Sequence, residues 1–116
     1  MRGNVPMLVF WLVLSWTLAA LGEEISYRGY VMNRVADFFG RTAAAWAAAV
    51  LITSVLFGVG HLYQGASGIA SNFVSALVYS GLYLGSDRNL WVPILAHGME
   101  DTVAFTLIFL GRYPGL

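Results

Sequence analysis

Three short polar clusters interrupt a chain that is otherwise mostly apolar. They read Glu23-Glu24-Ile-Ser-Tyr-Arg28, Phe57-Gly-Val-Gly-His61 and His97-Gly-Met-Glu100-Asp101. Carboxylates and imidazoles are the usual general acids and bases of enzymes. Ionisable side chains are also costly inside a membrane, so they mark functional sites there. The function of this chain is therefore expected to reside in these three clusters.

Helical spacing separates the roles of the two glutamates. Glu24 and Arg28 are four residues apart, which puts them on one face of a helix with the acid in the favourable N-terminal position. Glu23 points about 100° away around the helix and has no such partner. A desolvated carboxylate without a counter-charge is the better proton acceptor, so Glu23 is the candidate general base. The alternative is that all three residues form an interfacial charge cluster at a helix end.

The two histidines have neighbours at helical spacing. Phe57 lies one turn before His61, so its ring can pack against the imidazole. His97 and Asp101 are also four residues apart. The carboxylate can then accept an imidazole N–H and select the tautomer, or both side chains can face a substrate oxygen. Taken alone, His61 is more often a structural histidine at a helix end, whereas the pair of His97 and Asp101 is as compatible with a structural role as with a functional site.

The composition of the whole chain indicates a membrane protein. Of its 116 residues, 59% are hydrophobic and only 10% are charged, which lies outside the usual range of soluble domains. The formal net charge is zero, so the chain lacks the basic field that nucleic-acid binding requires. Cysteine is absent, which excludes disulfides, thiolate metal ligands and a cysteine nucleophile.

Four apolar stretches are each close to the ~20 residues that cross the hydrocarbon core of a bilayer. They run from Met7 to Leu21, Ala43 to Gly60, Ile69 to Leu84 and Trp91 to Leu110. We therefore expect an all-α polytopic membrane protein, a core bundle of about four transmembrane helices forming a single domain over residues 1–116. Gly81 and Gly85 form a GxxxG pattern, a weak signal for a helix contact.

The first helix is expected to continue beyond its apolar stretch to about Arg34, because apolar and aromatic residues recur there every three to four positions. At ~1.5 Å per residue, this places Glu23 and Glu24 well inside the bilayer. The alternative is a secretory signal peptide, since Arg2, an apolar run and two alanines at positions 19 and 20 follow one another in the order that such peptides have.

Arginines distinguish the two ends of the predicted bundle. Arg34, Arg41 and Arg88 fall on one side, and Arg2 and Arg112 on the other. The positive-inside rule makes the first side cytoplasmic by a small majority.

The predicted helices do not by themselves bring the polar residues to one depth. Counted from the shared loop side, His97 lies roughly 10 Å in, Glu23 roughly 20 Å and His61 nearer 30 Å at ~1.5 Å per residue. Tilted or shortened helices are needed to bring them together.

The order of the three clusters and their flanking residues resembles a known family. The segments are Glu23-Glu24-x-x-x-Arg28-Gly29, Phe57-x-x-x-His61-Leu62-x-x-Gly65 and Pro93-Ile-Leu-Ala-His97-x-x-x-Asp101. They resemble the CPBP family, which comprises CAAX prenyl endopeptidases and bacteriocin-processing proteins and is also called the Abi or type II CAAX protease family. The resemblance extends from about residue 8 to residue 110. Its members usually have about eight helices, with extra ones before the first motif, so this chain is expected to correspond to their four-helix core, as a fragment, a minimal member or an inactive relic.

The resemblance implies an intramembrane endopeptidase in which a glutamate and a histidine activate water, and a second histidine and an amide-bearing residue stabilise the oxyanion. On this sequence, Glu23 is the base, His61 helps to hold the water, and His97 with Asp101 faces the scissile carbonyl. Glu24, Arg28 and Phe57 are then supporting residues. The family commonly has Asn where this chain has Asp101, and Asp cannot donate to an oxyanion unless it is protonated. Asp101 is therefore expected to orient His97, and Glu100 to be a solvated bystander.

The resemblance also sets the expectations for cofactors and partners. Two histidines and several carboxylates match a catalytic zinc set in type, but HExxH is absent, so no metal is favoured. The expected partners are a peptide or protein substrate, either a prenylated CAAX-type or a leader-type peptide, and the lipid bilayer of a bacterial-type plasma membrane. Two alternatives remain: a small ion- or proton-handling membrane protein, and a non-catalytic immunity or adaptor protein with the same fold.

Overall fold

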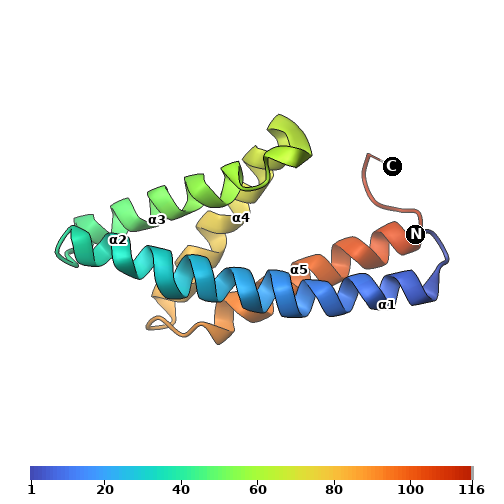
Figure 1. Ribbon diagram of the computed structural model, residues 1–116, viewed down its shortest axis with the longest axis horizontal. Helices are drawn as coiled ribbons and strands as arrows, with labels where there is room; N and C mark the ends of the chain where they lie inside the picture. Colours follow the sequence, from blue (N-terminus) through green and yellow to red (C-terminus); the bar gives the residue numbers. More distant parts are fainter. Residues whose placement is uncertain (116) are drawn as a thin grey trace.

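The computed structural model describes residues 1–115, which form four main helices joined by short turns (Figure 1). The first is a continuous helix from Val5 to Phe38, called the long helix below. It consists of α1 (Val5–Leu14), the π-helical stretches η1 (Ser15–Glu23) and η2 (Ile25–Met32), and α2 (Asn33–Phe38). The remaining elements are α3 (Ala43–Val59), the short 3-10 turn η3 (Leu62–Gln64), α4 (Gly65–Gly85) and α5 (Trp91–Phe109). The expected all-α fold is confirmed.

The long helix has clear start and stop signals. Asn4 caps it by accepting a hydrogen bond from the Met7 backbone N–H at 3.1 Å, and Pro6 occupies its first turn. It extends one turn beyond the expected end near Arg34, to Phe38. There the chain turns through Gly40, whose φ of 87° is left-handed. The helix passes through residues 19 and 20 without a break.

The middle of the long helix is wound more widely than the α-helix that the sequence predicts. The π-helical stretches extend from Ser15 to Met32 and are interrupted only at Glu24. The Asn33 side chain donates hydrogen bonds to the Arg28 and Gly29 carbonyls at 2.8 and 3.3 Å, and to the Tyr83 hydroxyl at 3.0 Å. π-Helical turns occur frequently at functional sites. Here they carry the first polar cluster.

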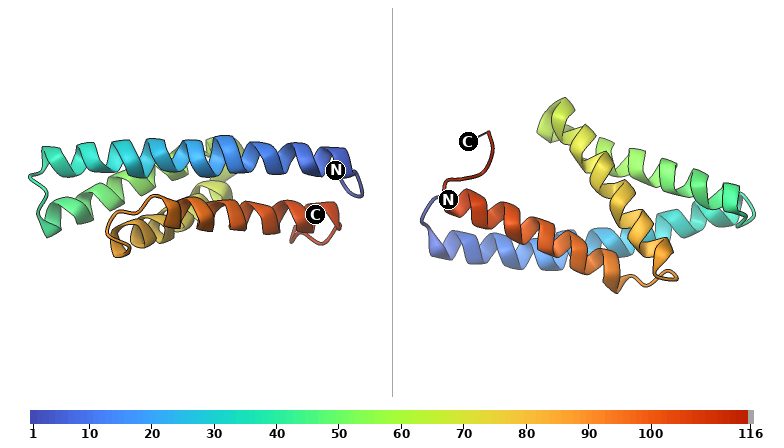
Figure 2. Two further views of the ribbon diagram at one scale, coloured as in Figure 1. Left: turned by 90° about the horizontal axis from the view of Figure 1, so that it is seen from below. Right: turned by 180° about the vertical axis from the view of Figure 1, so that it is seen from behind.

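The other helices are arranged around the long helix, as Figures 1 and 2 show. α3 runs antiparallel to its second half, and α5 runs antiparallel to its first half. α4 folds back along α3 and connects it to α5. Gly58 allows the close approach of α3 to α4, since a Cβ there would lie 2.9 Å from the Ile69 carbonyl oxygen. The GxxxG signal at Gly81 and Gly85 was wrong, because both positions face open space.

Two helices are long and apolar enough to cross a membrane, namely Val5–Phe38 and Trp91–Phe109. α3 and α4 meet at a sharp break, and together they make a third candidate span if the bent pair counts as one. Large apolar side chains cover the outside of the helices, with Val9, Phe10 and Leu18 each more than half exposed. Such a surface suits lipid rather than water.

Candidate active site

A buried ion pair lies at the centre of the polar cluster on the long helix. Glu24 and Arg28 are both fully buried, and Arg28 Nη1 lies 3.1 Å from Glu24 Oε2. Arg28 also donates to the Ala76 carbonyl at 2.9 Å and, more weakly, to the Ser80 hydroxyl at 3.4 Å on α4. The expected pairing of Glu24 with Arg28 is therefore present. Arg28 also makes the additional hydrogen bonds that a buried charge needs.

His97 is oriented from the long helix rather than from its own helix. Its Nδ1 lies 2.9 Å from Glu24 Oε2, which makes a hydrogen bond, whereas its Nε2 lies 3.6 Å from Asp101 Oδ2. The carboxylate expected to orient the imidazole was Asp101, and the structure gives the hydrogen bond to Glu24 instead. The imidazole is also stacked on Tyr79, with ring centroids 4.8 Å apart and planes 12° apart.

Glu23 faces a different environment from Glu24, as the helical spacing predicts. Its side chain is 33% exposed, and its Oε2 lies 3.9 Å from His97 Nε2. Within residues 1–115, this buried oxygen has no hydrogen-bond partner. A carboxylate oxygen beside an open space and free of a partner is in a position to accept a proton from a bound molecule.

His61 follows the end of α3 at Val59, where the chain turns into η3. The arrangement of the helices closes the depth difference that the sequence alone left open, since His61 lines the same cleft as Glu23 and His97. His61 Nδ1 lies 2.6 Å from the Phe57 carbonyl oxygen, and the two rings are 4.7 Å apart. A carbonyl oxygen only accepts hydrogen bonds, so Nδ1 must carry the proton. In the neutral imidazole, Nε2 is then the acceptor.

A cleft of about 370 Å³ joins these side chains. Glu23, His61, His97 and Asp101 all line it. Its other walls are polar on the side of η3 and α4 and largely apolar on the side of the long helix and α5. They include Tyr63, Gln64, Asn72, Trp11, Leu14, Leu18 and Phe105. Three of the residues singled out from the sequence do not line this cleft and lie behind it: Glu24, Arg28 and Phe57.

Two residues on the far side of His97 were missed or misread from the sequence. Tyr79, which stacks on His97, had no signal because it lies in an ordinary apolar stretch. Glu100 was expected to be a solvated bystander, but its carboxylate accepts hydrogen bonds from Ser75 at 3.0 Å and from the Tyr79 hydroxyl. Glu100 therefore holds the ring against which His97 packs.

The arrangement of donors also bears on the zinc alternative. Among the side chains of residues 1–115, no group of three or more His, Cys, Asp or Glu is placed to hold a metal ion. His97 Nδ1 is directed at Glu24, which is itself paired with Arg28. His97 Nδ1 and Glu24 Oε2 are thus already engaged with each other.

Comparison with known protein families identifies the kind of protein to which this cleft belongs. A sequence model of the family described as Type II CAAX prenyl endopeptidase Rce1-like matches residues 5–103. The chain belongs to this family. Searches of curated proteins and of solved structures gave no significant match.

The Rce1-like match covers all three polar clusters and every residue that lines the cleft except Phe105. It bears out the resemblance that the order of those clusters suggested. Membership assigns the chain to a class of membrane proteases. Together with the apolar helices, it identifies an integral membrane protein.

Proposed function

We propose that this protein is an intramembrane endopeptidase of the glutamate type, with Glu23 as the general base. The observation that supports this most directly is the unpartnered, buried Oε2 of Glu23, which lies in a cleft shared with both histidines. A water molecule held between Glu23 and His61 Nε2 attacks the scissile carbonyl carbon. Its proton passes to Glu23, and the C–N bond breaks as Glu23 returns that proton to the leaving amine.

His97 is the proposed stabiliser of the oxyanion. With Nδ1–H held by Glu24, the other ring nitrogen faces the cleft, and in the protonated imidazole it donates a hydrogen bond there. Carboxylate oxygens of Glu24, Asp101 and Glu23 lie within 4 Å of the imidazole nitrogens and neutralise the charge of that form. Asp101 acts through His97, because a carboxylate cannot itself donate to an oxyanion.

The proposed substrates are prenylated CAAX-type or leader-type peptides. One wall of the cleft is apolar, with Trp11 stacked on Phe105 at a centroid distance of 5.8 Å, and it continues into the lipid-facing surface of α1. A peptide that carries or adjoins an apolar chain can approach along this wall without leaving the bilayer. The polar side of the cleft would then hold the peptide backbone.

A proton relay is less well supported by the same geometry. The hydrogen-bonded series from His97 through Glu24 ends at Arg28, which donates to a backbone carbonyl and a serine. An arginine does not deprotonate in proteins, so it cannot pass a proton onward. The series therefore orients His97 and does not conduct.

The test is peptide cleavage by the purified protein in lipid, followed by mass spectrometry. Wild type is compared with Glu23→Gln over a panel of prenylated and leader-type peptides, each with and without a chelator. We expect Glu23→Gln to lower the cleavage rate by a factor of about 10²–10⁴, the usual contribution of a general base. Asp87→Asn is the matched control, since it removes a carboxylate that does not line the cleft.

The outcomes separate the candidate functions. Cleavage that is lost in Glu23→Gln, kept in Asp87→Asn and insensitive to chelator supports the glutamate mechanism. Loss on chelation would instead indicate a metalloprotease. An intact, folded wild type that cleaves none of the peptides would favour the adaptor or immunity alternative.

A further inference from the structure

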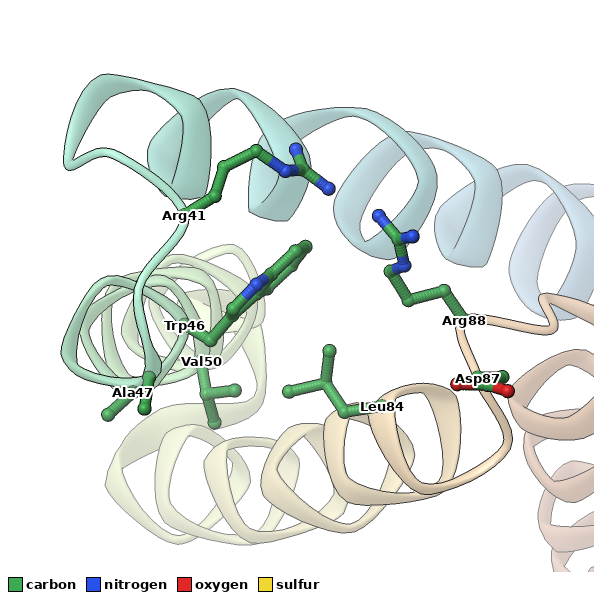
Figure 3. Close-up of a pocket in the computed structure, with 8 residues that line it drawn as sticks. Arg41, Trp46, Ala47, Val50, Leu84, Asp87 and Arg88 are labelled. Atoms are coloured by element: carbon green, nitrogen blue, oxygen red, sulfur yellow. The ribbon is translucent and has the colours of Figure 1, made fainter.

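A second cavity, of about 580 Å³, is lined by residues of α3, the end of α4 and the turns beside them (Figure 3). These segments lie at the end of the molecule opposite the two termini (Figure 1). It shares no lining residue with the candidate active site. Its floor is apolar and comes from α3 and the end of α4, through Ala47, Val50 and Leu84. Its upper part carries Trp46 and two arginines, Arg41 and Arg88.

The two arginines converge on a single aromatic ring. The guanidinium carbon of Arg41 lies 4.8 Å from the centroid of Trp46, and that of Arg88 lies 5.7 Å from it. Figure 3 shows both guanidinium groups directed toward one another above the indole. Two like charges beside the same ring repel each other, and an anion between them relieves that repulsion.

The local carboxylates do not fully neutralise these charges. Asp37 is shared, since its two oxygens lie 2.5 Å from Arg41 and 2.8 Å from Arg34. Arg88 makes no ion pair with any residue of the described chain, residues 1–115. Together with Asp87, which lines the cavity, this local group holds three arginines (Arg34, Arg41 and Arg88) and two aspartates (Asp37 and Asp87). The surplus is a single positive charge.

Three residues that line this cavity have an unusual backbone conformation. Left-handed φ angles occur at Arg41 (58°), Asp87 (59°) and Arg88 (61°), which are the non-glycine residues with positive φ in the described part of the chain. Each arginine N–H closes the end of a helix by bonding a carbonyl five residues earlier, at 2.8 Å in both cases. Residues with side chains are seldom found in this conformation, and strain of this kind clusters at functional sites.

The surroundings of the cavity indicate a membrane–water interface. Phe38 and Phe39, at the end of the long helix, are 84% and 50% exposed. Exposed aromatic side chains beside arginines are typical of the headgroup level of a bilayer. The cavity thus has a cationic part at headgroup level and an apolar floor that continues along α3 and α4.

We propose that this cavity binds an anionic phospholipid, with the phosphate between Arg41 and Arg88 and an acyl chain along Val50 and Leu84. Guanidinium groups bind phosphate oxygens through paired N–H donors, and two of them are present here. A phosphatidylglycerol carries one negative charge, which matches the surplus of one. Phosphatidylcholine brings a cationic group as well, and so offers no net charge to the pair.

The test uses the full chain reconstituted in nanodiscs of phosphatidylcholine with added phosphatidylglycerol of the same acyl chains. Binding is read by native mass spectrometry, and by quenching of tryptophan fluorescence with brominated phosphatidylglycerol, compared between wild type and Trp46→Phe.

Arg41→Asn and Arg88→Asn each remove one charge while keeping a residue that tolerates positive φ. We expect each to weaken phosphatidylglycerol binding about fivefold, which corresponds to the usual contribution of one arginine at a lipid surface. Arg112→Asn, at the opposite end of the chain, is the matched control and should change nothing.

Several results would overturn this proposal. Equal binding of the two lipids is one, and an equal effect of Arg112→Asn is another, since that would mean general surface attraction. If soluble glycerol phosphate binds to the protein as tightly as phosphatidylglycerol does, the ligand is a free phosphate compound instead. Arg88→Lys keeps the charge but loses the paired donors, so it should bind phosphatidylglycerol more weakly than wild type and more tightly than Arg88→Asn, which separates loss of charge from loss of fold.

Discussion

Glu24 makes contact with both of its charged neighbours through one oxygen. Its Oε2 accepts from Arg28 on the same helix and from His97 on α5, while its Oε1 has no partner within residues 1–115. The contact with Arg28 could be predicted because the two residues are one helical turn apart. The contact with His97 could not, because it joins residues 73 apart in the chain. For the same reason, the bonds of Glu100 to α4 were not foreseen.

The burial of this pair predicts a large effect of removing one charge. In Glu24→Gln, Arg28 keeps its bonds to Ala76 and Ser80 but loses its counter-charge in a fully buried position. We expect the free energy of unfolding to fall by about 3–5 kcal/mol, as for other buried pairs with one partner removed. The measurement is unfolding in mixed detergent micelles.

The control for this change is an exposed pair on the same helix. Asp37→Asn removes the carboxylate shared by Arg34 and Arg41, where solvent already screens the charges. Its effect on unfolding should be small. Equal effects of the two substitutions would mean that Glu24 and Arg28 are hydrated in the folded protein.

At the scale of elements, close packing of α5 against the long helix determines where His97 lies. Gly98, the next residue, packs directly against the ring of Trp16, and a Cβ there would overlap that ring. The indole N–H of Trp16 in turn donates to Thr102 at 3.0 Å, one turn later on α5. The sequence did not indicate this contact, because a single glycine in an apolar helix carries no directional signal. The positions of the four helices were predictable from hydropathy and from the Gly-rich turns between them.

Gly98→Ala should therefore separate α5 from the long helix. We expect a loss of stability of about 1–3 kcal/mol, the usual cost of adding a methyl group to a packed contact. Cleavage activity should fall as well, since His97 moves with its helix. Unfolding in mixed micelles and the peptide assay measure the two effects.

Gly81→Ala provides the matched control, because a Cβ at Gly81 meets no atom within 4 Å. It should leave stability unchanged or raise it by up to about 1 kcal/mol through helix propensity. If both alanine substitutions have the same effect, the contact between Gly98 and Trp16 does not determine the spacing of these helices.

For the whole molecule, the distribution of arginines predicts how the protein sits in the membrane. Arg41 and Arg88 meet at one end, and Arg2 lies against Gly111 at the other. The end with Arg41 should be cytoplasmic by the positive-inside rule. Because the chain has no cysteine, single-cysteine variants can be labelled without background. Ala44→Cys should react with an impermeant maleimide only in inverted vesicles, and Tyr113→Cys only in right-side-out cells; the reverse pattern would contradict this orientation.

The length of the long helix has a consequence for the choice of lipid. Its 34 residues run along the longest dimension of the molecule, which measures 50 Å, whereas the hydrocarbon core measures ~30 Å (Figure 1). The helix must tilt or project from the bilayer, and the degree of tilt depends on bilayer thickness. α1 contributes no buried residue and has α5 as its packing partner, so tilting changes the apolar wall of the cleft first. Proteolytic rate should thus vary with acyl-chain length in otherwise identical liposomes, and a rate that is the same from 14-carbon to 22-carbon chains would show that thickness has no influence on this site.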